Sequence, residues 1–345
     1  MRIHTIPGRA LARVAPVALV PVVALLIGGC VAKPKPAQSG APEAVEYYVR
    51  GEQARRAGDA ATAEREYKAA VQRNPNLRMA HSRLGDMYKQ RGDYAGASRH
   101  YESLARLDPY NPLSHYNVGL AYQFLNRLQD AAAAYLRALN LNPSDVKSNM
   151  NLGLVYLALG QVDDAVKYLQ RATELDPRSA VAWSNLGVAL DARGDTSVAE
   201  QRYRRSLELD SNSVTTLQNL AANLVVQGKA GEAVTVMERV LERADTVGTR
   251  KRYGDALAQA KRYDDAIHQY DLALKRDPRY WPAMNEKGYV LIRQYREGLE
   301  LDSAKRTGAI ALWRDSLKFN NNQPAIRRQL EKAENPQLFG TGDGR

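Results

Sequence analysis

The sequence predicts an all-α solenoid of about eight helix-turn-helix units, and two features of its 345 residues lead to that prediction. One 34-residue pattern of small, large and proline positions recurs from residue 44 to about residue 320. Stretches such as "RRAGD" and "DARGD" recur near the middle of the period, where glycine can end one helix in the left-handed conformation before the next begins. Self-similarity at such a period is typical of stacked repeats that bury their apolar faces against one another.

Residues 1–29 are predicted to be a secretory signal peptide. They begin with the basic segment "MRIHTIPGRALAR", and an apolar run from Val14 to Ile27 follows. A membrane-spanning helix needs about 20 apolar residues. Because this run is shorter and contains two prolines, export is favoured over a permanent span.

The end of this segment, "IGGC", resembles the lipobox of bacterial lipoproteins. The resemblance implies cleavage before Cys30 and lipidation of Cys30; an ordinary signal peptide or an uncleaved anchor with a chance cysteine is the alternative. Val31 follows where Asp would retain a lipoprotein in the inner membrane, so the resemblance implies an outer membrane location facing the periplasm in a Gram-negative source. Cys30 is the only cysteine, which excludes intramolecular disulfides.

Residues 30–43 are predicted to form a lipid-anchored flexible linker, because "VAKPKPAQSGAPE" is rich in Pro, Ser, Gly and Ala. The chain carries 49 basic and 38 acidic side chains, a formal net charge of +11. These charges are interleaved, as in "QRYRRSLELD", and are not gathered into a stripe. They therefore indicate a solvated surface, and no nucleic-acid partner is expected.

The solenoid is predicted to occupy residues 44–320, with units starting near residues 44, 78, 112, 146, 180, 214, 247 and 281. Within a unit, position 8 is Gly or Ala, position 20 is Ala, position 24 is aromatic or large and apolar, and position 32 is often Pro. The small residues allow two helices, A and B, to cross closely beside the large residue. The proline ends helix B because it cannot continue the hydrogen-bond ladder.

The eighth unit departs from the period by nine inserted residues around "QYREGLELDSAKR". Longer helices are favoured over a recognition loop there, because terminal repeats are commonly atypical. Residues 321–345 are predicted to form a polar capping helix, opened by Pro324, and a frayed tail.

This pattern closely resembles the tetratricopeptide repeat over residues 44 to about 320. The resemblance implies a right-handed superhelix whose A helices line a concave groove for protein or peptide partners, with no chemistry of its own. In this family, positions 2, 5, 9, 12 and 13 of helix A line the groove, with position 6 alongside. Mapped onto units 3 to 6, these positions give the candidate partner-binding residues Tyr116, Leu120, Phe124, Met150, Leu154 and Val188.

The groove is predicted to be apolar in its middle and charged at its start, because position 9 is acidic in flanking units, as Glu52, Asp86 and Asp255. An exposed apolar strip usually marks a partner site. The alternatives are closure of the superhelix over these residues and pairing of two copies through them.

Position 6 carries an asparagine in the same four units, as Asn117, Asn151, Asn185 and Asn219. An amide both donates and accepts, so it can pair with a peptide group of an extended ligand. The ladder resembles that of the O-linked N-acetylglucosamine transferase superhelix, although the transferase domain is absent. A structural hydrogen bond to a neighbouring helix is the alternative, and the frequency of Asn at this position in the family favours it. The family's chaperone-binding carboxylate clamp is not matched, since position 9 lacks Asn.

No motif predicts catalysis, a cofactor or a bound metal. The five histidines lack HExxH-like spacing, and His81 and His115 stand at position 4, where other units place Tyr47 and Trp183. Core packing is therefore favoured over metal ligation. "GTGDG" near the end resembles a phosphate loop only as a string, because no strand is predicted before it and no helix after it. We expect a protein that is not an enzyme and needs no cofactor.

The sequence thus predicts an exported, lipid-anchored scaffold or adaptor that holds a partner protein or extended peptide in its groove, in cell-envelope assembly. The alternative is a structural subunit that self-assembles through the apolar groove of units 3 to 6 and is therefore an oligomer.

Overall fold

The computed structural model describes residues 41–298 and 302–335. The predicted signal peptide, the lipidation site Cys30 and most of the predicted linker lie outside the described residues. So does the predicted tail from residue 336 onward. Within the described part of the chain, no helix is long and apolar enough to cross a membrane.

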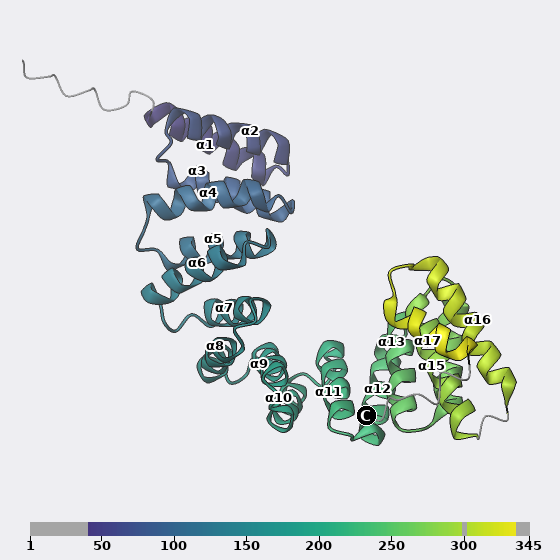
Figure 1. Cartoon of the computed structure of the whole chain (residues 1–345). Coiled ribbons are helices and arrows are strands. Elements are labelled where there is room, and N and C mark those ends of the chain that lie inside the picture. The colour runs from purple at the N-terminus through teal and green to yellow at the C-terminus, as the bar shows by residue number, and fades with distance from the viewer. Residues whose placement is uncertain (1–40, 299–301, 336–345) are drawn as a thin grey trace, which may run out of the picture.

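All regular elements of the described residues are helices, which pair in chain order. The A and B helices of the eight units are α1 (Ala41–Arg56) and α2 (Ala60–Arg73), α3 (Arg78–Gln90) and α4 (Tyr94–Leu107), α5 (Pro112–Phe124) and α6 (Leu128–Leu141), α7 (Val146–Ala158) and α8 (Val162–Leu175), α9 (Ala180–Arg193) and α10 (Thr196–Leu209), α11 (Val214–Val226) and α12 (Ala230–Arg243), α13 (Val247–Gln259) and α14 (Tyr263–Arg276), and α15 (Trp281–Glu297) and α16 (Ser303–Phe319). A single helix, α17 (Pro324–Glu334), follows. The pairs stack along a curved path, so the molecule is a helical repeat solenoid (Figure 1).

The first helix begins earlier than the sequence pattern suggests. Residues 41–43, expected in the linker, are the first residues of α1. Pro42 does not prevent this, because the missing N–H of a proline in the first turn of a helix has no partner within that helix anyway.

Close crossing of the A and B helices rests on position 8. A Cβ added to Gly85 would lie 2.5 Å from the Tyr101 ring, and one added to Gly187 would lie 2.6 Å from the Tyr203 ring. These rings fill the crossing: the five tyrosines at position 24 are at most 1% exposed, namely Tyr67, Tyr101, Tyr135, Tyr203 and Tyr270. Only glycine, which has no Cβ, lets an aromatic ring pack this closely. Glycine at position 8 therefore occurs together with tyrosine at position 24.

The turn from helix A to helix B depends on one residue with positive φ, at position 15. Glycine holds it in five units, with φ between 74° and 93°, at Gly58, Gly92, Gly160, Gly194 and Gly228. Units 3 and 7 instead use Asn126 at φ 57° and Lys261 at φ 60°. Lysine rarely adopts this conformation, so the turn of unit 7 carries local strain.

The eighth unit absorbs its insertion mainly in longer helices, as expected. Helices α15 and α16 each have 17 residues, against 13 or 14 in the A and B helices of units 2 to 7. Trp313 takes the place of the tyrosine and meets Gly288, where a Cβ would lie 2.5 Å from the indole nitrogen. Helix α17 then covers the end of the stack, with Ile326 and Ala333 buried against α16 and its neighbours.

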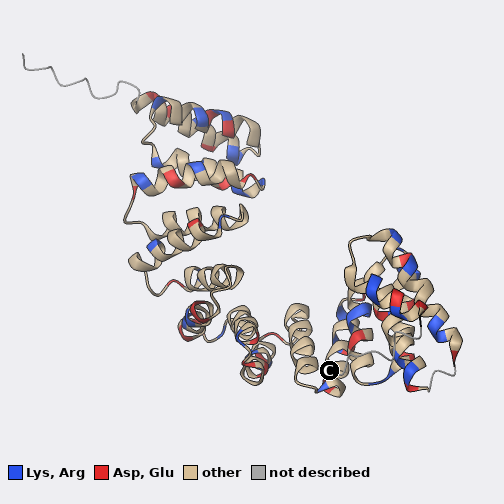
Figure 2. Cartoon of the chain, viewed as in Figure 1, with Lys and Arg blue, Asp and Glu red and all other residues tan. Residues whose placement is uncertain are grey.

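Charged side chains of both signs are interleaved over most of the helices (Figure 2). Two A helices differ, because α5 and α11 contain no Lys, Arg, Asp or Glu. The uncharged surface therefore lies in the middle of the solenoid.

Candidate partner-binding groove

The A helices of successive units meet along one surface, and side-chain contacts between units identify it. Arg83 at position 6 of unit 2 donates from Nε to Glu52 Oε1 of unit 1 at 2.7 Å. Arg252 at the same position of unit 7 donates from Nη1 to Gln218 Oε1 of unit 6 at 2.5 Å. Positions 5, 6 and 9 of neighbouring A helices thus share one face of the molecule. We call the part of this face that belongs to α5, α7, α9 and α11 the central groove.

Large apolar side chains are exposed at the edges of the groove-lining helices. In and around the central groove they are Leu113, Phe124, Val181 and Val226, which are 59–73% exposed. Leu113 and Val181 stand at position 2 of their units, and Phe124 and Val226 stand at position 13. Val45 and Met79 extend the row of position 2 to units 1 and 2, at 46% and 51% exposure. Leaving these side chains in water is unfavourable, so the row is a candidate contact surface.

The predicted groove residues divide into two groups. Leu120, Leu154, Val188, Met150 and Tyr116 are all partly buried. Met150 and Val188 also pack against the buried core, as does Tyr116, so these three support the fold as well as facing the groove.

Phe124 has a partner within the chain. Its ring stacks on Tyr94 of unit 2 with centroids 4.2 Å apart and planes 6° apart. It nevertheless keeps 59% of its surface exposed. Phe124 therefore offers one open ring face and links units 2 and 3.

All four asparagines at position 6 are partly buried, but they do not behave alike. Asn151 Nδ2 lies 3.2 Å from Tyr116 Oη, which ties α7 to α5. Within the described residues, no comparable side-chain hydrogen bond is formed by Asn117, Asn185 or Asn219. The amides of these three are thus available to a ligand, whereas Asn151 already joins two neighbouring units.

The acids at position 9 of the flanking units are bound by buried tyrosine hydroxyls. Tyr67 Oη donates to Glu52 at 2.7 Å, and Tyr101 Oη donates to Asp86 at 2.8 Å. Tyr270 Oη likewise donates to Asp255 at 3.0 Å. The tyrosine side chain at position 24 therefore spans the crossing of helices A and B, and its hydroxyl donates to a carboxylate on the groove-lining face.

Glu52 is the most strongly bound of these acids. Hydrogen bonds from Arg55, Tyr67 and Arg83 lower the pKa of Glu52 to about 2, against the smaller opposing effect of its burial. Burial raises the pKa of Tyr67 above its ordinary value, so the phenol keeps its proton and remains the donor. Glu52 is therefore ionised, and Arg55 and Arg83 neutralise its charge within the chain.

The tyrosine hydroxyl has another acceptor in the central units. In unit 3 it donates to Gln123 Oε1, and in unit 5 Tyr203 donates to Asp191 Oδ2, each at 2.8 Å and each at position 12. Asn223 also donates to Asp191 at 2.5 Å, and burial raises the pKa of this carboxyl.

Units 4 and 6 place Leu169 and Met237 at position 24, which have no hydroxyl. An apolar position 9 is therefore found where the phenol is absent or bound elsewhere. The sequence analysis did not predict this relation between the tyrosine hydroxyl and the residue at position 9, although the residue types at positions 9, 12 and 24 indicate it.

The histidines at position 4 have a structural role. His81 Nε2 lies 2.9 Å from Pro75 O, and His115 Nε2 lies 2.9 Å from Pro109 O. The next two units make the same contact with other donors, Asn149 to Pro143 O and Trp183 to Pro177 O. The side chain of position 4 thus binds the end of the preceding unit. Among the described residues, no group of three or more His, Cys, Asp or Glu is placed to hold a metal ion.

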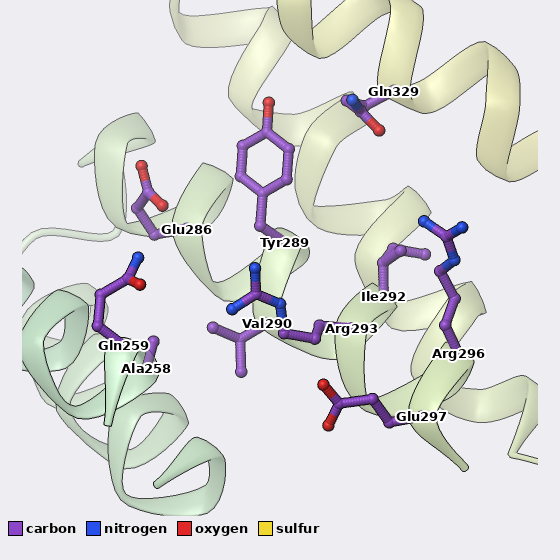
Figure 3. A pocket seen from close by; sticks show the side chains of 10 residues that line it. All are labelled: Ala258, Gln259, Glu286, Tyr289, Val290, Ile292, Arg293, Arg296, Glu297 and Gln329. Carbon is purple, nitrogen blue, oxygen red and sulfur yellow. The ribbon is translucent and has the colours of Figure 1, made fainter. Parts of the chain in front are cut away.

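Two cavities lie at the C-terminal end of the groove-lining face. One, of about 360 Å³, joins units 6 and 7 and is lined by Gln218, Asn219, Ala222, Val225, Met237, Arg252 and Asp255, among others. The other, of about 540 Å³, lies where α13, α15 and α17 meet and brings together Gln259, Glu286, Tyr289, Arg293 and Gln329 (Figure 3). Helix α17 therefore borders the groove-lining face at unit 8, while the first cavity contains the last residue of the asparagine series.

Comparison with known proteins agrees with the repeat geometry. The family model described as "Tetratricopeptide repeat" matches residues 116–180, 150–214, 219–280 and 251–307, and one described as "TPR repeat" matches residues 85–123. Among curated proteins, no significant match was found.

The solved structures to which this chain is similar include proteins of different sizes. A tetratricopeptide repeat protein from Parabacteroides merdae is 17% identical, over 74% of this chain and 99% of its own, with a TM-score of 0.57. One chain of the APC/C hetero-tetramer Cut9-Hcn1 is 15% identical, over 80% of this chain and 54% of its own, with a TM-score of 0.56. MamA is 26% identical, over 49% of this chain and 92% of its own, with a TM-score of 0.47. The first two likenesses show the fold.

Proposed function

The chain belongs to the tetratricopeptide-repeat family, and we propose that it is an exported, lipid-anchored scaffold whose central groove holds a partner protein or an extended polypeptide segment. Proteins of this family bind protein or peptide partners, which supports the coarse role. The finer role, in assembly of the cell envelope, rests on the signal and lipobox features of residues 1–30.

One observation carries the binding role. Large apolar side chains on α5, α9 and α11 are 59–73% exposed to solvent. Two of these helices, α5 and α11, contain no charged residue. Because an isolated solenoid gains nothing from exposing them, covering them is favourable by roughly 25 cal/mol per Å² of apolar surface removed from water. The available amides of Asn117, Asn185 and Asn219 add hydrogen-bonding groups for a backbone.

The test places a charge in the middle of the central groove. Leu154→Glu should abolish capture of the partner by crosslinking and pull-down from native membranes, because a carboxylate cannot be buried against an apolar segment without a counter-charge. Gln201→Glu, on the exposed side of α10, adds the same charge elsewhere and should leave capture unchanged. A Leu154→Glu variant that captures the partner as well as the parent would move the site away from this face.

The exposed apolar row also favours a second candidate, a structural subunit whose copies pair through the groove. Sedimentation of the purified protein distinguishes the two, because self-assembly predicts an oligomer that Leu154→Glu dissociates. A monomer at all concentrations would reject the second candidate and leave the row to another partner.

The anchor is tested separately from the groove. Cys30→Ala should remove lipidation and release the protein from the membrane fraction, with its melting temperature unchanged. Continued tight membrane association of this variant would indicate an uncleaved helix in place of a lipid.

A further inference from the structure

The cavity of about 360 Å³ between units 6 and 7 has an apolar floor. Ala221, Met237 and Ala256 of this floor belong to the buried core, and Val225 packs against that core. The volume lies at the lower end of the range for ligand pockets, about 300–1,000 Å³. The cavity therefore has room for one side chain of a bound polypeptide.

The cavity arises from short side chains at two positions of unit 6. In units 1, 2 and 7 a tyrosine at position 24 and its carboxylate acceptor at position 9 fill the groove side of the helix crossing. Unit 6 instead has Met237 at position 24 and Ala222 at position 9, which is the smallest residue at that position in the eight units. Unit 4 also lacks the hydroxyl, but its position 9 is the larger Leu154. The space is therefore left open in unit 6.

Polar side chains line the rest of the cavity. Gln218 and Asn219 come from positions 5 and 6 of unit 6, while Arg252 and Asp255 come from positions 6 and 9 of unit 7. The amide of Asn219 is available, and an amide can both donate to and accept from a peptide group. The cavity thus complements an apolar side chain at its floor and the backbone next to that side chain at its edge.

The charged groups of this region differ in their partners. Asp255 accepts a hydrogen bond from Lys251 Nζ at 2.8 Å, and Lys251 also lies 3.7 Å from Glu286 of unit 8. Arg252 is exposed, and its Nη1 donates to the neutral amide oxygen of Gln218. Among the described residues, the ion pairs here therefore leave Arg252 with a neutral partner. A carboxylate on the ligand would complement its charge.

We propose that this cavity anchors the bound segment: it takes one large apolar side chain, such as leucine, from an extended polypeptide in which a neighbouring acidic side chain pairs with Arg252. The anchor rests on the proposed function, because it assigns residue types to the polypeptide that the central groove holds. The acid is placed in a side chain and not at a chain terminus, because the groove-lining face continues past the cavity to Tyr289 and Arg293 of unit 8.

The first test titrates short capped peptides into the purified full chain. Labelled with ¹³C in its methionine methyl groups, the chain reports occupancy of the cavity through Met237, whose signal is identified with Met237→Leu. Acetyl-Asp-Leu-Asp-amide should shift this signal. It should bind at least about tenfold more tightly than acetyl-Asp-Ala-Asp-amide, because only leucine buries a large apolar surface in the cavity. Equal responses to the two peptides would overturn the anchor.

The acidic neighbour is tested with the same signal. Acetyl-Asn-Leu-Asn-amide should bind roughly two- to fivefold more weakly than acetyl-Asp-Leu-Asp-amide at low salt, which is the range of an exposed ion pair. Arg252→Gln should remove this difference. Arg205→Gln removes one charge from helix B of unit 5 and should retain the difference.

Two outcomes would contradict the acidic neighbour. Equal affinities of the Asp and Asn peptides for the parent chain would reject the pairing with Arg252. Acetyl-Asn-Asn-Leu with a free carboxylate, if it binds as tightly as acetyl-Asp-Leu-Asp-amide, would instead place the acid at a chain terminus.

The second test fills the cavity. Ala222→Leu should weaken binding of acetyl-Asp-Leu-Asp-amide at least about tenfold and reduce capture of the partner from native membranes. Its melting temperature should stay near that of the parent, because units 3 and 4 carry leucine at this position. Val188→Leu is the matched control, since it places the same side chain at position 9 of unit 5, outside the cavity, and should bind the peptide as the parent does.

Partner capture separates this inference from the proposed function. If Leu154→Glu abolishes capture and Ala222→Leu leaves both capture and peptide binding unchanged, the groove holds its partner but the anchor is wrong. If both variants capture the partner as the parent does, the site lies elsewhere, and the proposed function is rejected together with the anchor.

Discussion

In units 1, 2 and 7 the hydroxyl of the buried tyrosine at position 24 donates a hydrogen bond to a carboxylate at position 9 of helix A. In units 3 and 5 it donates instead to the side chain at position 12, three residues further along that helix. The backbone and the glycine against which the ring packs are the same in both regions. The two regions differ in which residue of helix A accepts the hydrogen bond from the tyrosine hydroxyl. A buried phenol needs an acceptor, so moving that acceptor to position 12 leaves position 9 open to apolar residues.

The position of the residue that accepts the tyrosine hydrogen bond explains how one repeat makes two kinds of groove surface. The flanks are polar and largely satisfied by contacts within the chain, such as those that Glu52 makes with Arg55 and Arg83. The central groove has Leu120, Leu154 and Val188 at position 9 instead. A surface that is already satisfied gains little from a ligand, so the central groove is the better candidate for recognition.

The largest effect is expected from overpacking a central unit. Ala165 of α8 is fully buried where α7 and α8 cross, and its carbonyl oxygen would lie 3.2 Å from a Cβ on Gly153. Ala165→Leu should lower the free energy of unfolding by about 1–3 kcal/mol, because the added methyl groups have no space. Calorimetry should also show one melting transition becoming two, since each repeat is stabilised by its neighbours.

Ala133→Leu is the control for this change, because Ala133 is exposed on α6 and should tolerate the larger side chain. If Ala165→Leu melts with the parent, the helix crossing is not where the repeat pattern places it.

Removal of the tyrosine hydroxyl tests the comparison directly. Tyr101→Phe leaves Asp86 with Lys89 at 3.5 Å as its remaining partner, whereas Tyr135→Phe leaves the neutral amide oxygen of Gln123. Hydrogen bonds to charged groups are worth more than neutral ones, so we expect losses of about 1.5 kcal/mol for Tyr101→Phe and about 0.5 kcal/mol for Tyr135→Phe in urea unfolding. Equal losses would mean that the charge of the acceptor does not distinguish the two regions.

The asparagines of the central groove should separate into two behaviours. Asn151→Ala removes the bond to Tyr116 and should cost about 0.5–1.5 kcal/mol of stability. Asn185→Ala should leave the melting temperature unchanged while lowering the yield of crosslinked partner, if its amide grips a peptide backbone. A fall in melting temperature for Asn185→Ala, before any ligand is added, would instead assign the whole ladder to the fold.

The smallest effect concerns the turn of unit 7. A positive φ costs a residue with a Cβ about 1–2 kcal/mol, and Lys261→Gly removes this cost. The greater conformational freedom of glycine in the unfolded chain offsets roughly half of the gain. Thermal melting should therefore show a small stabilisation. The reciprocal change in a central unit, Gly228→Lys at φ 75°, should destabilise by a similar amount. A Gly228→Lys variant that melts with the parent would show that the turn tolerates side chains generally.

The all-α repeat architecture and the pairing of small and large positions could be predicted from the amino-acid pattern. Glycine at position 8 and tyrosine at position 24 recur together because each is sterically required by the other, so local patterns reveal a tertiary contact. The longer helices of unit 8 also followed from the nine-residue insertion. Proline at position 32 likewise marked the end of the B helices in units 1 to 4, because backbone chemistry acts within a few residues.

Which polar side chains already have a hydrogen-bond partner could not be predicted in this way, because the partners come from other helices of the folded chain. Asn151 and Asn185 occupy the same repeat position, yet one bonds to Tyr116 and the other has no side-chain bond within the described chain. His81 and His115 are likewise equivalent in sequence, but His81 alone faces a second imidazole. These differences depend on side chains from the adjacent helix or unit, and a hydrogen bond forms only over about 3 Å. A repeat pattern fixes where such a side chain stands, while the neighbour packed against it decides whether it is satisfied or free to bind.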